Sequence, residues 1–351
     1  MMNWDIVPQV TGDQQAVWQE AADTWRLPYW DWAADPSVPS VVRGDAVSDL
    51  GMAAYDPIFW LHHCNVDRQF AIYQNNNGKD QWLTGATKGT DPTPTDNLYP
   101  FHTDTKFNHW NSDGVKGWTT LGYTYPDLAP ETDSSGTAPL ELVQKRLTEK
   151  YGVLRRVLHE VGSTQNIEGL DNDYVINIIY NRFPLNGVSY SIHFFIGKES
   201  DIPESPEDYK LSVDYTGGIH IFSSNYWTRG NENGVNCENC QKQQNNHQLS
   251  KGQLPVTLAL LQRALHDDKR WAEINHLGKD HVVEYMTKHL QWRAVAVPNQ
   301  LLKTDDLPDL KVFFKTGRAE HPEDPAQPSK YFGYEPQWGV TKDKFGGAKP
   351  E

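Results

Sequence analysis

The hydrophobic pattern of this chain changes across one stretch rich in proline, glycine and serine, residues 128–139. Before this stretch, apolar residues recur at helical spacing in 13–25 and in 57–73. After it, short β-branched and aromatic runs separated by turn residues favour an antiparallel sandwich or barrel. The sequence therefore predicts an α+β multidomain chain, helical first and β-rich second.

The predicted domains follow from that change of period. They are, in chain order, a helical unit, a linker with one helix, a β-rich unit and a polar tail: 1–127, 128–170, 171–300 and 301–351. In the β-rich unit we expect three strands, at 173–180, 189–196 and 218–223. We expect the tail to be mobile, because it is polar and interrupted by prolines and glycines.

Charge and composition narrow the possible partners. The net charge of −14 disfavours binding to nucleic acid or to an anionic membrane surface. No apolar run approaches the roughly 20 residues needed to cross a bilayer, and the N-terminus lacks a basic region followed by an apolar one. Three cysteines are too few for a disulfide framework. We therefore expect a cytoplasmic protein that binds neither nucleic acid nor membrane.

The most informative motif begins at Asp56 and reads Asp-Pro-x-Phe-x-x-His-His-x-x-x-Asp-Arg. On a helix, Phe59, His63 and Asp67 fall on one face, whereas His62 points about 100° away from His63. Imidazole suits copper, and a neighbouring ring commonly fixes the orientation of such a ligand. The same pattern is compatible with ordinary core and capping residues.

A second motif is the Cys-x-x-Cys of Cys237 and Cys240. Two thiolates at this spacing can hold a soft ion such as Cu(I), bind zinc, or close into a redox disulfide. A zinc half-site or two free thiols remain open alternatives.

Together these segments resemble the tyrosinase family. The run from Asp56 is similar to the third-ligand segment of that family's second copper site, and 25–33 is similar to the segment after its first copper site. Pro100-Phe101-His102 and the Tyr-x-Tyr element of Tyr123 and Tyr125 resemble the end of the catalytic domain. Residues 173–227 and 252–297 resemble the β-rich C-terminal cap of fungal tyrosinases.

The resemblance implies a partial four-helix, type-3 copper domain followed by a β-rich cap. It also implies a copper cofactor, with phenols and O2 as substrates: hydroxylation of monophenols and oxidation of diphenols to quinones, as in melanin-type pigment pathways. By position, His63 is the implied copper ligand and His62 a weaker candidate, while Phe59, Asp67 and Arg68 have supporting roles. Cys237 and Cys240 match a motif with an implied role in copper handling.

The sequence departs from the family in its histidines. The family binds two coppers through six histidines, but no histidine precedes His62, so five of the six are missing. We expect His102 and His109, in a region predicted as loop, not to replace them. We expect surface or packing roles for the rest: His159, His193, His220, His247, His266, His276, His281, His289 and His321.

Three hypotheses follow from this departure. The chain is a truncated or mis-spliced tyrosinase-type oxidoreductase with impaired activity, a non-catalytic copper-handling remnant, or a misfolded fragment. As written, we expect it to be inactive towards phenols.

Overall fold

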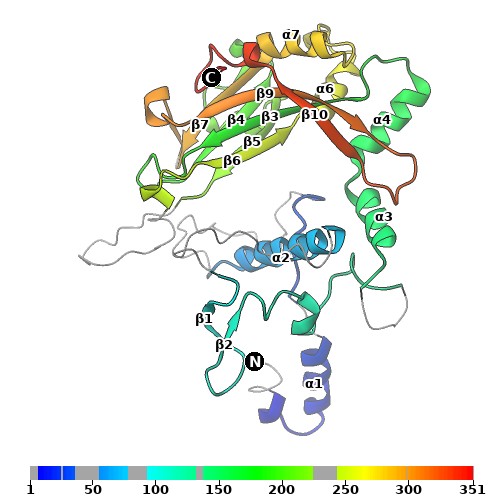
Figure 1. Cartoon of the computed structure of the whole chain (residues 1–351), viewed down its shortest axis with the longest axis vertical. Coiled ribbons are helices and arrows are strands. Elements are labelled where there is room, and N and C mark those ends of the chain that lie inside the picture. The colour runs from blue at the N-terminus through cyan, green and yellow to red at the C-terminus, as the bar shows by residue number, and fades with distance from the viewer. Residues whose placement is uncertain are drawn as a thin grey trace. The chain divides into compact units, whose positions relative to one another are not determined.

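A computed structural model describes residues 7–24, 27–35, 55–77, 93–131, 137–223, 243–297 and 299–350. The chain divides into two compact units, Met1–Tyr151 (unit 1) and Gly152–Glu351 (unit 2). Helices dominate the described part of unit 1 and sheets dominate unit 2 (Figure 1). The predicted α+β class is confirmed. None of the described helices is long and apolar enough to span a membrane.

Unit 1 contains three helices among its described residues, together with short 3-10 turns and one small hairpin. Its elements are η2 (Val7–Gln9), α1 (Gln14–Thr24), α2 (Pro57–Asn77), β1 (Asn97–His102), β2 (His109–Asn111), η5 (Trp118–Leu121) and α3 (Leu140–Tyr151). The sequence predicts mostly irregular loop in the region of β1 and β2. That expectation was wrong for these two strands, which pair antiparallel.

The core of unit 1 is small. It joins Ala71 of α2 and Val143 of α3 to Trp118, Tyr125 and Leu128 in the segment between them. Leu128 is fully buried, although it begins the stretch expected to form an exposed linker. Residues 132–136 of that stretch lie outside the described residues. The start of the expected linker is thus part of the packed unit.

Unit 2 is built on two four-stranded antiparallel sheets, ordered β10-β9-β3-β6 and β5-β4-β7-β8. The strands are β3 (Asn172–Tyr180), β4 (Tyr190–Ile196), β5 (Tyr215–Ile221), β6 (Ser250–Pro255), β7 (Leu290–Ala296), β8 (Gln300–Leu301), β9 (Lys311–Glu320) and β10 (Lys330–Pro336). The helices are α4 (Val153–Thr164), α6 (Thr257–Ala264) and α7 (Lys279–His289), with 3-10 turns η6 (Glu199–Asp201), η7 (Pro206–Leu211), η8 (Lys269–Trp271), η9 (Thr304–Asp306) and η10 (Trp338–Val340).

One apolar core joins the two sheets and the helices of unit 2. Ile176 of β3, Phe194 of β4 and Trp292 of β7 all belong to it. Phe195 points the other way, because successive strand residues face opposite sides of a sheet. It packs in a second cluster with Tyr209. Strand β4 is therefore buried on both faces, which explains its nearly continuous apolar sequence.

The C-terminal segment is not the mobile polar tail that its composition predicts. Strand β9 lies between β3 and β10, and Phe314 is paired with Ile176. Val312 and Phe314 are fully buried. The expectation was wrong because inward apolar residues alternate here with outward polar ones such as Lys311 and Lys315, so that the segment has a polar composition although it keeps the period of a strand.

The boundary between the two units also differs from the expected one. A single helix was expected over 141–157, inside a linker. The structure divides it at Gly152 into α3 and α4, which fall in different units. The expected linker over 128–170 is therefore shared between the two units.

Candidate metal centre

Helix α2 carries the histidine pair and begins where the sequence predicted. The Asp56 side chain accepts a hydrogen bond from the Ile58 N–H at 3.0 Å, which caps the first turn. The rings of Phe59 and His63 lie 4.3 Å apart, so the predicted shared face is confirmed for these two residues. The His63 side chain is exposed.

His62 lies on a different side of α2 and already has a partner. Trp32 donates its indole N–H to Nδ1 of His62 at 3.1 Å. Burial lowers the pKa of His62, and the nearby His63 lowers it further. Because Nδ1 accepts the indole N–H, this nitrogen is not free to bind a metal.

Asp67 is bound by the Tyr-x-Tyr element. Tyr123 and Tyr125 both donate their phenolic O–H to the same carboxylate oxygen of Asp67, at 2.7 and 2.5 Å. Burial and the bond to Asp67 raise the pKa of both phenols, so they remain protonated donors. The Tyr-x-Tyr element is thereby attached to α2.

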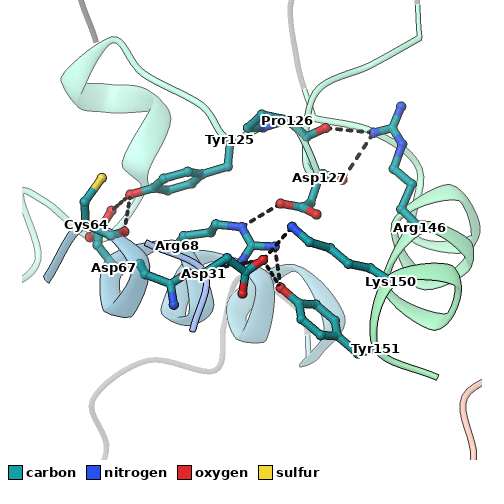
Figure 2. Close-up of polar contacts among 11 residues, drawn as sticks. Asp31, Cys64, Asp67, Arg68, Tyr125, Pro126, Asp127, Arg146, Lys150 and Tyr151 are labelled. Carbon is teal, nitrogen blue, oxygen red and sulfur yellow. Dashed lines mark hydrogen bonds and ion pairs between the residues drawn. The ribbon is translucent and has the colours of Figure 1, made fainter. Parts of the chain in front are cut away.

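Arg68 lies at the centre of a buried polar network, which Figure 2 shows. Its side chain is fully buried and donates to Asp127 at 2.6 Å, to Asn65 at 3.1 Å and to the Tyr151 hydroxyl at 2.9 Å. The ring of Tyr29 lies 4.9 Å from the guanidinium carbon. Through these contacts Arg68 connects α2 with α3 and with the segment before α3.

Asp31 closes the network from the N-terminal side. It lies 3.5 Å from Arg68 and 2.5 Å from Lys150, and it accepts the Tyr151 hydroxyl at 2.7 Å. Burial by itself would raise the pKa of Asp31, but the bonds from Lys150 and Tyr151 and the charge of Arg68 outweigh it and lower that pKa. A buried guanidinium is tolerated only when charges and hydrogen bonds offset its lost hydration. This network supplies both.

The described residues do not fit a binuclear copper site. Among them, no group of three or more His, Cys, Asp or Glu side chains is placed to hold a metal ion. A copper ion of such a site needs about three imidazoles. His63 offers one, and its neighbour His62 is turned towards Trp32. We therefore derive no chemical step through copper from this geometry.

One of the three cysteines, Cys64, lies among the described residues. Cys237 and Cys240 lie outside the described residues. Cys64, on α2, is half-buried, and its Sγ lies 3.7 Å from the Leu27 carbonyl oxygen. Burial raises the pKa of the Cys64 thiol, which makes it a poor thiolate ligand.

Sequence reasoning missed two relationships between distant residues. His102 and His109 are paired across β1 and β2, with ring centres 4.6 Å apart. Asp127 is the partner of Arg68, although 59 positions separate them. A hairpin prediction over 97–111 would have revealed the first relationship, but no local pattern in the sequence indicates the second.

Comparison with known proteins identifies the family of this chain. Residues 173–314 match the model of the tyrosinase C-terminal domain, and residues 40–76 match that of the common central domain of tyrosinase. Tyrosinase of Aspergillus fumigatus is 32% identical over 282 residues, which cover 79% of this chain and 40% of that protein. The chain belongs to the tyrosinase family. This is a family of type-3 copper enzymes, and the resemblance seen in the sequence is confirmed.

Two further proteins are similar to this chain over part of their length. Polyphenol oxidase 3 of Agaricus bisporus is 31% identical over 46% of this chain and 31% of that protein. The structure of recombinant mushroom tyrosinase matches with a TM-score of 0.51 and 20% identity, over 80% of this chain and 49% of the other. This tyrosinase-family chain thus spans less than half of each of the relatives named here.

Proposed function

We propose that the protein is a copper oxidoreductase of tyrosinase type by descent, and that these 351 residues alone do not oxidise phenols. Family membership supports the first part, with phenolic compounds and O2 as the substrates that belong to that chemistry. The histidine count supports the second, since no imidazole precedes His62 in the sequence.

The observation that carries the proposal is the isolation of His63. Its face of α2 provides a ring, Phe59, that orients it, but the described residues add no further ligands around it. A single exposed imidazole binds copper weakly and leaves the other coordination positions to water. Such an ion is not held beside a second one in a dry pocket, so the site lacks what phenol oxidation requires.

Oxygen consumption tests this proposal. The copper-loaded chain is mixed with a catechol and, separately, with a monophenol, and O2 uptake and bound copper are measured together. We expect uptake equal to that of free copper, and His63→Ala should not change it. Substrate-dependent uptake that disappears in His63→Ala would overturn the proposal, because it would show that His63 works with ligands not recognised above.

A copper-handling role without catalysis is the second candidate, and the spacing of Cys237 and Cys240 favours it. Two thiolates at this spacing suit Cu(I). Under reducing conditions we expect about one Cu(I) per chain, lost when both cysteines are replaced by serine. Unchanged Cu(I) binding in that double variant would reject this role, and equally strong zinc binding would favour a structural zinc site.

The remaining hypothesis, a misfolded fragment, makes a different prediction. A misfolded chain would unfold without cooperativity, whereas a chain with a packed β-rich unit should show at least one sharp transition. Urea denaturation followed by far-ultraviolet circular dichroism separates these outcomes.

A further inference from the structure

The hairpin of β1 and β2 places two imidazoles directly opposite each other. His102 and His109 are register partners, and directly opposed residues of antiparallel strands project to the same side. Their ring centres lie 4.6 Å apart with 46° between the ring planes. His102 is exposed and His109 is half-buried, so the pair can be reached from solvent.

This separation is compatible with two imidazoles that share a metal ion. An ion about 2.1 Å from one nitrogen of each ring, with its two bonds at a right angle, puts the ring centres about 4.5 Å apart. From this agreement we propose that His102 and His109 chelate one divalent transition-metal ion of the Cu²⁺ type, with water in the remaining positions. The site is separate from His63 and from the Cys-x-x-Cys motif.

Other histidine pairs in the described residues have different ring separations, such as 5.2 Å for His62 and His63 and 5.9 Å for His193 and His220. The rings of His276 and His281 are stacked, 4.1 Å apart and only 19° from parallel. An ion in the plane of one ring would lie outside the plane of the other. His220 is held by Ser191, whose hydroxyl lies 2.7 Å from its Nδ1. The hairpin pair therefore differs from the other pairs in ring separation, and from the stacked pair in orientation as well.

Neighbouring rings restrict the orientation of both imidazoles. Tyr99 packs against His109 with centres 4.3 Å apart, and Phe107 packs edge-on against His102 at 5.0 Å. The β1–β2 register shifts between Asn97 and His102, and Tyr99 and His102 both contact the ring of His109. Side chains held in place before binding lose less entropy when the ion arrives.

The turn between the two histidines is also fixed by hydrogen bonds. Asp104 accepts the N–H groups of Lys106 and Asn108, at 2.9 and 3.2 Å, and the Asn108 side-chain amide at 2.7 Å. Thr103 donates its N–H to the Asn108 carbonyl at 2.7 Å. Because Asp104 is used in these bonds, it is not counted as a ligand here. The turn sets the distance between the strands and so between the imidazoles.

The chemistry of the donors selects the ion. Imidazole nitrogen suits copper, zinc and nickel, and Cu²⁺ binds most tightly among the common divalent ions. Cu²⁺ prefers a tetragonal arrangement, in which two nitrogens occupy neighbouring positions at a right angle. The ring separation matches that arrangement better than a tetrahedral one, for which the centres would be about 5.2 Å apart.

The test is Cu²⁺ titration of the full chain, followed by electron paramagnetic resonance. Cys237 and Cys240 are first replaced by serine in every sample, so that thiols do not compete. We expect His102→Asn and His109→Asn each to weaken Cu²⁺ binding at least about tenfold, because each breaks a linked pair of ligands. The nitrogen hyperfine pattern should change from two nitrogens to one.

His247→Asn is the matched control. His247 is exposed and has φ 49°, a backbone conformation that asparagine tolerates. Its replacement should leave Cu²⁺ binding unchanged. Equal losses in the control and in the hairpin variants, or full binding in the His102→Asn/His109→Asn double variant, would overturn the proposal.

A second readout guards against unfolding of the hairpin in the variants. In the parent chain, Cu²⁺ should slow amide hydrogen exchange in 97–111 and leave α3 unaffected. Cu²⁺ binding without such protection would also overturn the proposal. Neither result depends on phenol oxidation, so these measurements test the site independently of the proposed function.

Discussion

The two units of this chain are stabilised by different kinds of contact. Unit 2 surrounds a cluster of 26 buried apolar residues, whereas the described part of unit 1 has a cluster of six. Helix α2 buries Asn65, Arg68 and Gln74 within unit 1. On its other side Phe70 and Tyr73 are 40% and 51% exposed. The helix thus buries much of its polar side and exposes aromatic residues.

This difference indicates which of the two units draws more stability from apolar burial. Apolar burial contributes roughly 25 cal/mol per Å², so the larger cluster of unit 2 contributes more stability than the cluster of unit 1. A buried polar network contributes less net stability, since the hydration that its charges lose offsets most of their attraction. We infer that unit 2 is stable and that unit 1 is marginal, although its network specifies its arrangement closely.

The largest expected effect is in the core of unit 2. Phe194 is fully buried, and Phe194→Ala should lower the free energy of unfolding by about 3–5 kcal/mol, since a cavity remains. Phe222→Ala is the control, because Phe222 is 63% exposed. Urea denaturation measures both. Similar losses in the two variants would contradict the view that this core carries the stability of unit 2.

A comparable effect is expected at the centre of the unit 1 network. Arg68→Met should destabilise unit 1 by about 3 kcal/mol, because Asp127 is left buried without its cation. Hydrogen exchange should then accelerate in α2 and α3 while β3 keeps its protection. Lys145→Met, on the exposed side of α3, serves as the control. If α2 keeps its protection from hydrogen exchange in Arg68→Met, the claim that the polar network holds unit 1 together is contradicted.

The stability of unit 2 should depend on pH through one buried histidine. His193 is 8% exposed, and burial, with the nearby charges of His220 and Lys210, lowers its pKa to about 4. In the unfolded chain the His193 imidazole is protonated near pH 6.5, whereas in the folded chain it is protonated only near pH 4. The free energy of unfolding is therefore highest above pH 6.5 and decreases as the pH falls. The loss should reach about 3 kcal/mol at pH 4.

Denaturation of the parent and of His193→Gln between pH 7 and pH 4 measures this effect. The variant should show a flatter dependence on pH in this range. His247→Asn should keep the dependence of the parent. A dependence that is the same in all three chains would assign the acid sensitivity to other groups.

The smallest expected effect is at the Tyr-x-Tyr element. Tyr125→Phe removes one hydrogen bond to Asp67, while Tyr123 still donates to that carboxylate. We expect a loss of about 1–2 kcal/mol in unit 1. Tyr99→Phe, at an exposed phenol, should cost less. A larger loss in Tyr99→Phe would mean that the element is not attached to α2 as described.

Local patterns in the sequence predicted many of the elements. Strand β3 begins one residue before the expected 173–180, and α2 begins after Asp56 as its capping pattern indicated. These signals work because side-chain period and capping act over a few residues. Strand β9 was missed because its polar alternate positions conceal the same signal.

The arrangement around the candidate site was less predictable. The shared face of Phe59 and His63 follows from helix geometry alone. The burial of Arg68 does not, because it depends on Asp31, Asp127 and Tyr151, which come together only in the folded unit. A charged residue on a helix looks the same in sequence whether it is buried in a network or exposed to water.

Hydrogen exchange of the full chain, with and without copper, tests the central claim most directly. A ligand that binds only the folded state stabilises it, so a complete copper site would slow exchange around its ligands. The account predicts strong protection in β3 and β4, weak protection in α2, and no change in α2 when copper is added. Copper-dependent protection of α2 that His63→Ala abolishes would contradict it.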